Sequence, residues 1–167
     1  MIRTVVHFVD SSTFGGNEQA LLHLLAGLDR RRWRSVLLHH ADPGLAPLLE
    51  GARRLNVETR IVPKLLRMQT IAGLPRFFQQ LRLECPAIFH AYLNWLLSCK
   101  YGLLAAALAR VPAIIATASC RRNPRTEKGR QDCISTPRWI ATLGYCANSV
   151  RTRSSSGSEI AIRVKAK

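Results

Sequence analysis

Acidic residues are scarce in this sequence of 167 residues. It has 10 Asp and Glu against 25 Lys and Arg, which gives a formal net charge of +15 at pH 7. This imbalance favours anionic partners, namely nucleic acid, acidic lipid headgroups or phosphorylated small molecules. A solvated basic face without a partner is the alternative explanation. The shortage of carboxylates also indicates no catalytic acid–base pair, since Asp10 is the one acidic residue near the end of an expected strand.

Paired cysteines are absent as well. The five cysteines stand at positions 85, 99, 120, 133 and 146, and no Cys-x-x-Cys pair occurs. An odd number of isolated cysteines is typical of a reduced chain with buried thiols and argues against a zinc site or a disulfide framework. We therefore expect a cytoplasmic location, no metal site and no cofactor.

Long apolar runs and the common catalytic motifs are also missing. The longest apolar run, Tyr101–Ala109, is bracketed by Lys100 and Arg110 and is too short to span a bilayer. Any membrane contact would thus be peripheral, at the inner face of the membrane. The sequence contains neither His-Glu-x-x-His nor Gly-x-Ser-x-Gly, and neither of the two common glycine-rich phosphate loops.

What the sequence does have is a regular alternation of strand and helix patterns. Expected strands cover residues 3–9, 35–40, 57–62, 87–91, 113–118 and 145–150, with amphipathic or apolar helices between most of them. This order predicts the α/β class, with a Rossmann-like, doubly wound parallel sheet of about six strands. Residues 1–150 would form the domain. Residues 151–167 are basic and rich in Ser, and we expect a tail there.

The loop after the first strand contains two adjacent glycines. In sheets of this kind, ligands bind beyond the carboxyl ends of the strands. Gly15 and Gly16 stand there, at the start of a helix. Glycine lets the backbone approach a ligand, and the N–H groups of a helix start attract phosphate or carboxylate. The alternative is a tight turn with Asn17 as the helix cap.

Two further loops follow strand ends. His90 and Asn94, beside Trp95, would give a polar pocket with an apolar wall, although composition alone favours a packed role for the histidine. The stretch "SCRRNPRTEKGR" offers arginine pairs that suit phosphate, unless it is only a solvated basic loop. The candidate substrate-binding residues are therefore Gly15, Gly16, His90, Asn94, Arg121 and Arg122. No catalytic residue is assigned.

Three stretches together carry a resemblance to a known family. They are "GGNEQALLHLLAGLDRRRW", "AIFHAYLNWLLSCKYGLLAAALARVPAIIAT" and "YCANSVRTR". The chain resembles, over roughly residues 1–150, the N-terminal, acceptor-binding half of retaining glycosyltransferases of the GT-B fold, family 4. In that family a second, C-terminal domain with a Glu-x7-Glu pattern binds most of the nucleotide sugar, and nothing in this chain resembles that domain.

The resemblance implies half of a sugar-transferring enzyme of polysaccharide biosynthesis. Its partners would be a nucleotide sugar, a saccharide or lipid-linked acceptor and a separate C-terminal half. Peripheral contact with an anionic membrane stays open, and nucleic acid is not expected as a partner. Gly15 and Gly16 would approach the donor diphosphate or the acceptor, and His90 would lie near the cleft. Without the second domain, the chain is expected to be a truncated product that is inactive alone. The alternative is a non-catalytic basic Rossmann-like module that binds anionic membrane or nucleic acid, which a steep salt dependence would indicate.

Overall fold

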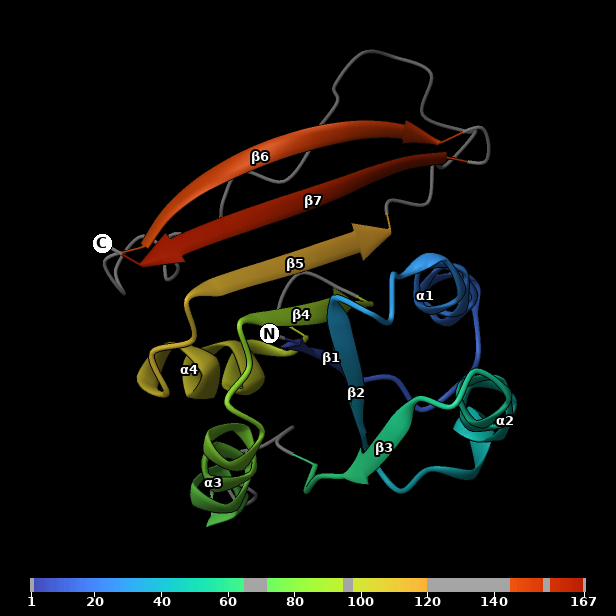
Figure 1. Ribbon diagram of the computed structural model, residues 1–167, viewed down its shortest axis with the longest axis horizontal. Coiled ribbons are helices and arrows are strands. Elements are labelled where there is room, and N and C mark those ends of the chain that lie inside the picture. The colour runs from blue at the N-terminus through green and yellow to red at the C-terminus, as the bar shows by residue number, and fades with distance from the viewer. Residues whose placement is uncertain (1, 65–71, 95–97, 120–144, 155–156, 167) are drawn as a thin grey trace.

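The computed structural model describes residues 2–64, 72–94, 98–119, 145–154 and 157–166 (Figure 1). They form one seven-stranded sheet in the order β3-β2-β1-β4-β5-β7-β6. In chain order, the elements are β1 (Arg3–Val9), α1 (Gly16–Gly27), β2 (Trp33–His39), the short 3-10 helix η1 (Pro43–Leu45), α2 (Ala46–Arg54), β3 (Glu58–Ile61), α3 (Leu74–Glu84), β4 (Ile88–Leu93), α4 (Lys100–Leu108), β5 (Ala113–Ser119), β6 (Tyr145–Ser154) and β7 (Gly157–Ala166).

The first five strands are parallel, which confirms the α/β, Rossmann-like fold. In β1, the central strand, Val6 pairs in register with Val36 of β2 and Phe89 of β4. Every residue from Val5 to Val9 is buried. A strand buried on both faces is typical of a parallel sheet covered by helices on both sides.

Two helical layers cover the sheet, as Figure 1 shows. Helices α3 and α4 pack on one face, where Phe77 of α3 and Leu103 of α4 join a core with Phe8. Helices α1 and α2 cover the other face, where Leu21 and Leu48 join a second core. No helix among the described residues is long and apolar enough to cross a membrane.

The far edge of the sheet differs from the expectation of about six parallel strands. The predicted strand at 145–150 exists as β6, but it pairs with β7 and not with β5. β7 runs antiparallel between β5 and β6, so five strands are parallel and the last two form a hairpin. Ile160, Ile162 and Val164 alternate with smaller or charged residues, which is a pattern typical of a strand. The prediction of a polar tail did not take this pattern into account.

The division of the chain into a domain of residues 1–150 and a tail of residues 151–167 stays a prediction.

An ion-pair network ties β2, β3 and α3 together near the amino ends of the strands. Arg34 donates two hydrogen bonds of 2.7 Å to the Glu58 carboxylate and one of 2.9 Å to Glu84. The side chain of Glu84 is only 7% exposed. The hydrogen bonds from Arg34 are the main reason why the pKa of Glu58 is lowered. Arg34 therefore neutralises a nearly buried carboxylate whose other partners are Arg60, at 3.6 Å, and the Gln80 amide, which donates a hydrogen bond of 3.1 Å.

Replacing Arg34 should therefore destabilise the fold. We expect Arg34→Ala to lower the free energy of unfolding by about 2 kcal/mol, because Glu84 loses its main partner but stays near solvent-exposed Arg60. Arg54→Ala is the matched control, since Arg54 forms an exposed pair with Glu50 and should cost about 0.5 kcal/mol or less. Urea denaturation measures both. Equal losses in the two variants would show that the network contributes no more than a surface pair.

Candidate functional site

The order of the strands reverses direction between β1 and β4. From β1 the chain proceeds to β2 and β3 on one side, and then returns to β4 and β5 on the other. At such a point, the loops leaving the carboxyl ends of the two central strands diverge, and ligands bind in the crevice between them. The loops here are the one that follows β1, residues 10–15, and the one that follows β4 from Asn94.

The carboxylate of Asp10, which follows β1, joins three other segments at this edge. Its Oδ1 lies 2.8 Å from Nε2 of His40, which follows β2. Its Oδ2 accepts a hydrogen bond of 3.1 Å from the backbone N–H of Cys99, just before α4. On its other side, His40 Nδ1 lies 3.1 Å from the carbonyl oxygen of Val62, which follows β3. One carboxylate and one imidazole therefore connect the ends of β1, β2 and β3 to the start of α4.

Both neighbours of the His40 ring are hydrogen-bond acceptors, a carboxylate and a carbonyl oxygen. Each ring nitrogen faces one of them, and the side chain of His40 is 1% exposed. These two contacts therefore hold the ring in place at the edge of the sheet. Asp10 is a structural partner in this arrangement and not a free base.

Substitutions of Asp10 test this connecting role. Asp10→Asn keeps the shape, and its amide still meets the His40 ring and the Cys99 N–H, so we expect a change of less than about 1 kcal/mol in stability. Asp10→Ala leaves two buried groups without a partner and should cost about 3 kcal/mol. Urea denaturation measures both variants. If Asp10→Ala were as stable as Asp10→Asn, the carboxylate would not be what holds these segments together.

The turn between β1 and α1 is capped by a carboxylate of its own. Glu18, in the first turn of α1, is buried and accepts hydrogen bonds from the Ser11 hydroxyl, at 2.6 Å, and from the Gly15 N–H, at 2.8 Å. The residue at the helix cap is Gly15, so the alternative that placed Asn17 there is wrong. Asn17 instead donates to the Leu93 carbonyl oxygen and to the Asn94 side chain. The two loops at the reversal point are thereby joined directly.

The turn is open at Gly16 and closed at its base. A Cβ on Gly16 would meet no atom within 4 Å, so a ligand has room to approach the backbone there. Below the turn, the Phe14 N–H donates a hydrogen bond of 3.1 Å to the Gly44 carbonyl oxygen. A Cβ on Gly44 would collide with the carbonyl oxygen of Ser12. Gly44 thus fixes the position of the loop while Gly16 leaves its outer side free.

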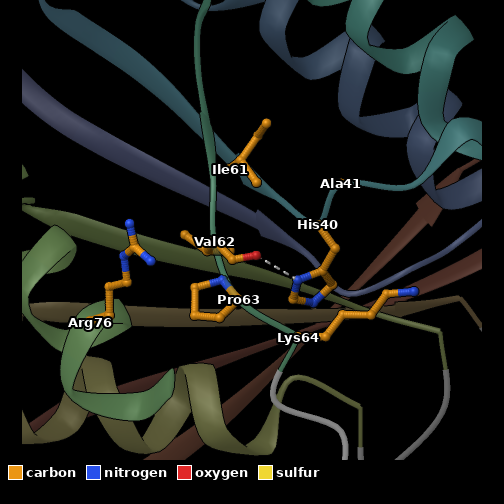
Figure 2. A pocket seen from close by; sticks show the side chains of 7 residues that line it. All are labelled: His40, Ala41, Ile61, Val62, Pro63, Lys64 and Arg76. Atoms are coloured by element: carbon orange, nitrogen blue, oxygen red, sulfur yellow. Dashed lines mark hydrogen bonds between the residues drawn. The ribbon is translucent and has the colours of Figure 1, made fainter. Parts of the chain in front are cut away.

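A pocket of about 440 Å³ opens at the carboxyl ends of β2 and β3, next to this turn (Figure 2). Its lining residues are His40, Ala41, Ile61, Val62, Pro63, Lys64 and Arg76. Figure 2 shows Arg76 and Lys64 on opposite sides of Pro63. Lys64 pairs with Asp42 at 3.0 Å, whereas Arg76 forms no ion pair within the described residues. The pocket is mostly apolar and carries one unneutralised cation. Through His40 it is coupled to Asp10 of the turn.

His90 lies elsewhere. It is the third residue of β4 and faces the same side of the sheet as its register partner His7. Its Nε2 is 2.8 Å from the Thr117 hydroxyl, and burial lowers its pKa to about 4. His7 is 1% exposed and neither ring nitrogen has a hydrogen-bond partner among the described residues. Burial, with a contribution from His90, lowers the pKa of His7 to about 3.

These two histidines should make the protein acid-sensitive. An unfolded histidine has a pKa of 6.5, so between about pH 4 and 6.5 the unfolded chain binds protons that the folded chain refuses. Stability is full above that window and is lost as pH falls through it, by about 2 kcal/mol per histidine at pH 5. We expect His7→Leu, which also removes two unpaired nitrogens, to stabilise the protein and to flatten this loss.

Urea denaturation at neutral pH and near pH 5 measures the effect. His23→Gln is the control because His23 is exposed on α1, and it should leave the acid loss unchanged. If His7→Leu and the control lose the same stability on acidification, His7 does not contribute to the acid sensitivity.

The structure brings some of the predicted site residues together and not others. Asn17 links the turn of Gly15 and Gly16 to Asn94, whereas His90 lies on a face of the sheet and contacts Thr117. Arg121 and Arg122 lie outside the described residues. The ligand-binding roles of all six stay predictions.

Sequence reasoning placed Asp10 near a strand end without a partner, and it assigned no site role to His40, Lys64 or Arg76. Glu18 had a local signal, because a Glu three residues after the helix cap is a known capping pattern. The contact between Asp10 and His40 spans 30 residues and leaves no local pattern.

Comparisons with known proteins establish the fold. No family model and no curated protein matches the sequence. Among solved structures, the human methyltransferase 10 domain containing protein superposes with a TM-score of 0.57 and 8% identity, over 98% of this chain and 72% of that one. The delta-N METTL16 MTase domain superposes with a TM-score of 0.53 and 9% identity, over 99% of this chain and 72% of that one. An uncharacterized protein from Listeria monocytogenes serotype 4b superposes with a TM-score of 0.54 and 7% identity over 98% of this chain. The chain spans 61% of that protein's length.

These neighbours overturn the expected glycosyltransferase. The named ones are methyltransferases, no glycosyltransferase is found among them, and the chain matches them across the β6–β7 hairpin as well as the parallel strands. Four expectations are therefore wrong. They are that the chain is half of a GT-B enzyme, that it transfers sugar, that its partners are a nucleotide sugar and an acceptor, and that nucleic acid is excluded. The stretches that carried the resemblance are a glycine turn that leads into α1, the passage from β4 through α4 to β5, and strand β6. Rossmann-like domains of many functions need these features.

Proposed function

We propose that this chain is a methyltransferase-type domain that binds a nucleoside methyl donor of the S-adenosylmethionine kind at the carboxyl edge of its sheet. The observation that carries the proposal is the open glycine turn at the strand-order reversal, next to a pocket, in a fold that methyltransferases share over nearly the whole chain. The ligand would extend from Gly16, at the start of α1, to the pocket beyond β2 and β3.

The residues present fit such a donor at two points. The space beside Gly16 admits a ligand up to the backbone. The pocket volume of about 440 Å³ falls in the range of small-molecule sites, and its apolar lining suits a nucleobase.

A bound donor of this kind supplies an activated methyl group. The task left to the chain is to hold the donor, to orient it and to exclude water, since correct placement accounts for much of the rate in such transfers. The fixed network of Asp10, His40 and the Cys99 N–H makes the floor of the site rigid. Such preorganisation lowers the cost of binding.

Gly16→Val tests the proposal directly. A Cβ at position 16 meets no atom within 4 Å, so we expect little change in stability and at least tenfold weaker binding of S-adenosylmethionine, about 1.4 kcal/mol. Isothermal titration calorimetry measures the affinity. The matched control is Gly27→Val, at the other end of α1, where a Cβ also meets nothing within 4 Å.

Two results would contradict the proposal. One is a wild-type protein that fails to bind S-adenosylmethionine or its demethylated product, S-adenosylhomocysteine. The other is an equal loss of affinity for S-adenosylmethionine in Gly16→Val and Gly27→Val, which would show that the glycine turn is not part of the binding site.

A further inference from the structure

The edge of the sheet opposite the ligand site carries a row of exposed arginines. In a parallel sheet the strands start at one edge, and the helices that cross back end there too. Arg3 begins β1, Arg30, Arg31 and Arg32 lie between α1 and β2, Arg82 is in the last turn of α3, and Arg110 follows α4. All six side chains are exposed. We call these six residues the arginine edge.

Two observations show that the arginine edge is continuous. The N–H of Arg3 donates a 3.0 Å hydrogen bond to the carbonyl oxygen of Arg32, which joins the first two groups. Strands β2, β1, β4 and β5 are consecutive neighbours, and the residues concerned precede or begin these four strands. Three gaps between strands span about 14 Å, which is the length of about four base-pair steps of a duplex.

None of these six arginines forms an ion pair within the described residues. Their neighbours do, because Arg34 and Arg60 pair with Glu58, and Arg53 and Arg54 pair with Glu50. The helix dipole accounts for Arg82, which lies in the last turn of α3, because a cation there stabilises a helix. It does not account for the other five, since α1 and α4 have no basic residue in their last turns. Like charges held together without partners destabilise a fold, so an external anion is the consistent explanation.

We propose that the arginine edge docks the phosphate backbone of a nucleic acid. All six cations are arginines, whose planar guanidinium binds phosphate with two parallel hydrogen bonds. The edge is built from loop, strand and helix ends and presents no amphipathic helix of the kind that lies on membranes. Contacts to phosphate position a nucleic acid without reading its sequence, so the docking is insensitive to sequence and sensitive to salt.

This docking surface is separate from the proposed methyl-donor site. Strand β1 has seven residues, so the two edges are about 23 Å apart. The surface anchors a nucleic acid and takes no part in chemistry at Gly16. Failure of donor binding would therefore leave this inference intact, and the reverse also holds.

The test compares two double variants that lose the same charge. Arg31→Gln with Arg32→Gln removes two cations from the arginine edge, and Lys64→Gln with Arg76→Gln removes two from the opposite edge. Short fluorescently labelled single-stranded RNA and duplex DNA of mixed sequence are titrated between about 50 and 200 mM salt, with binding followed by anisotropy. The slope of log affinity against log salt should fall by about 1.4 to 1.8 for the first variant and by much less for the second.

Each other outcome overturns the proposal. Equal changes in the two variants would mean that only net charge matters. No binding of either nucleic acid by the wild-type chain would remove the partner. Binding to phosphatidylserine vesicles without binding to RNA or DNA would assign the edge to a lipid surface. Arg82→Gln with Arg110→Gln, on other elements, provides a second variant that should also reduce the slope.

Discussion

The buried contact between Asp10 and His40 sets the geometry of the carboxyl edge. Backbone pairing aligns the strands but does not fix the segments that leave them. This pair does so for the ends of β1, β2 and β3, through hydrogen bonds to the carbonyl oxygen of Val62 and the N–H of Cys99. Cys99 is held in a left-handed conformation with φ 61°, which costs about 1–2 kcal/mol for a residue with a side chain. The bond to Asp10 offsets that strain and places the start of α4.

Local patterns predicted most of the fold and little of the site. The buried run of β1, the strand–helix alternation and the turn at Gly15 and Gly16 all depend on neighbours in sequence, and the structure confirms the architecture they predict. The pocket depends on residues from three separate elements, His40, Lys64 and Arg76, that meet only after folding. The hairpin was missed for another reason. Its alternating pattern was present in residues 160–164, but the basic and Ser-rich composition around it outweighed the alternation.

The wrong family assignment has a physical origin. A strand that enters a helix at the mouth of a crevice needs small residues in the turn, and the helices of a doubly wound sheet need apolar faces, whatever the domain binds. Glu18 illustrates the point. In the sequence it is part of a phrase that resembles a family motif, yet in the structure its carboxylate caps its own helix and accepts from Ser11. A residue that serves the turn recurs wherever such a turn is built, and so it carries little information on the substrate.

The distribution of charge follows from the same architecture. At the carboxyl edge Asp10, Glu18 and Asp42 are all engaged with partners within the chain, which makes that edge rigid. At the amino edge the six residues of the arginine edge are exposed, and none of them forms an ion pair within the described residues. Energies of groups more than about 10 Å apart usually add, so two edges separated by the length of β1 can each bind a partner without the other. A single layer of parallel strands thus supports a small-molecule site and a polyanion surface that are physically independent, because each depends on a different end of the same strands.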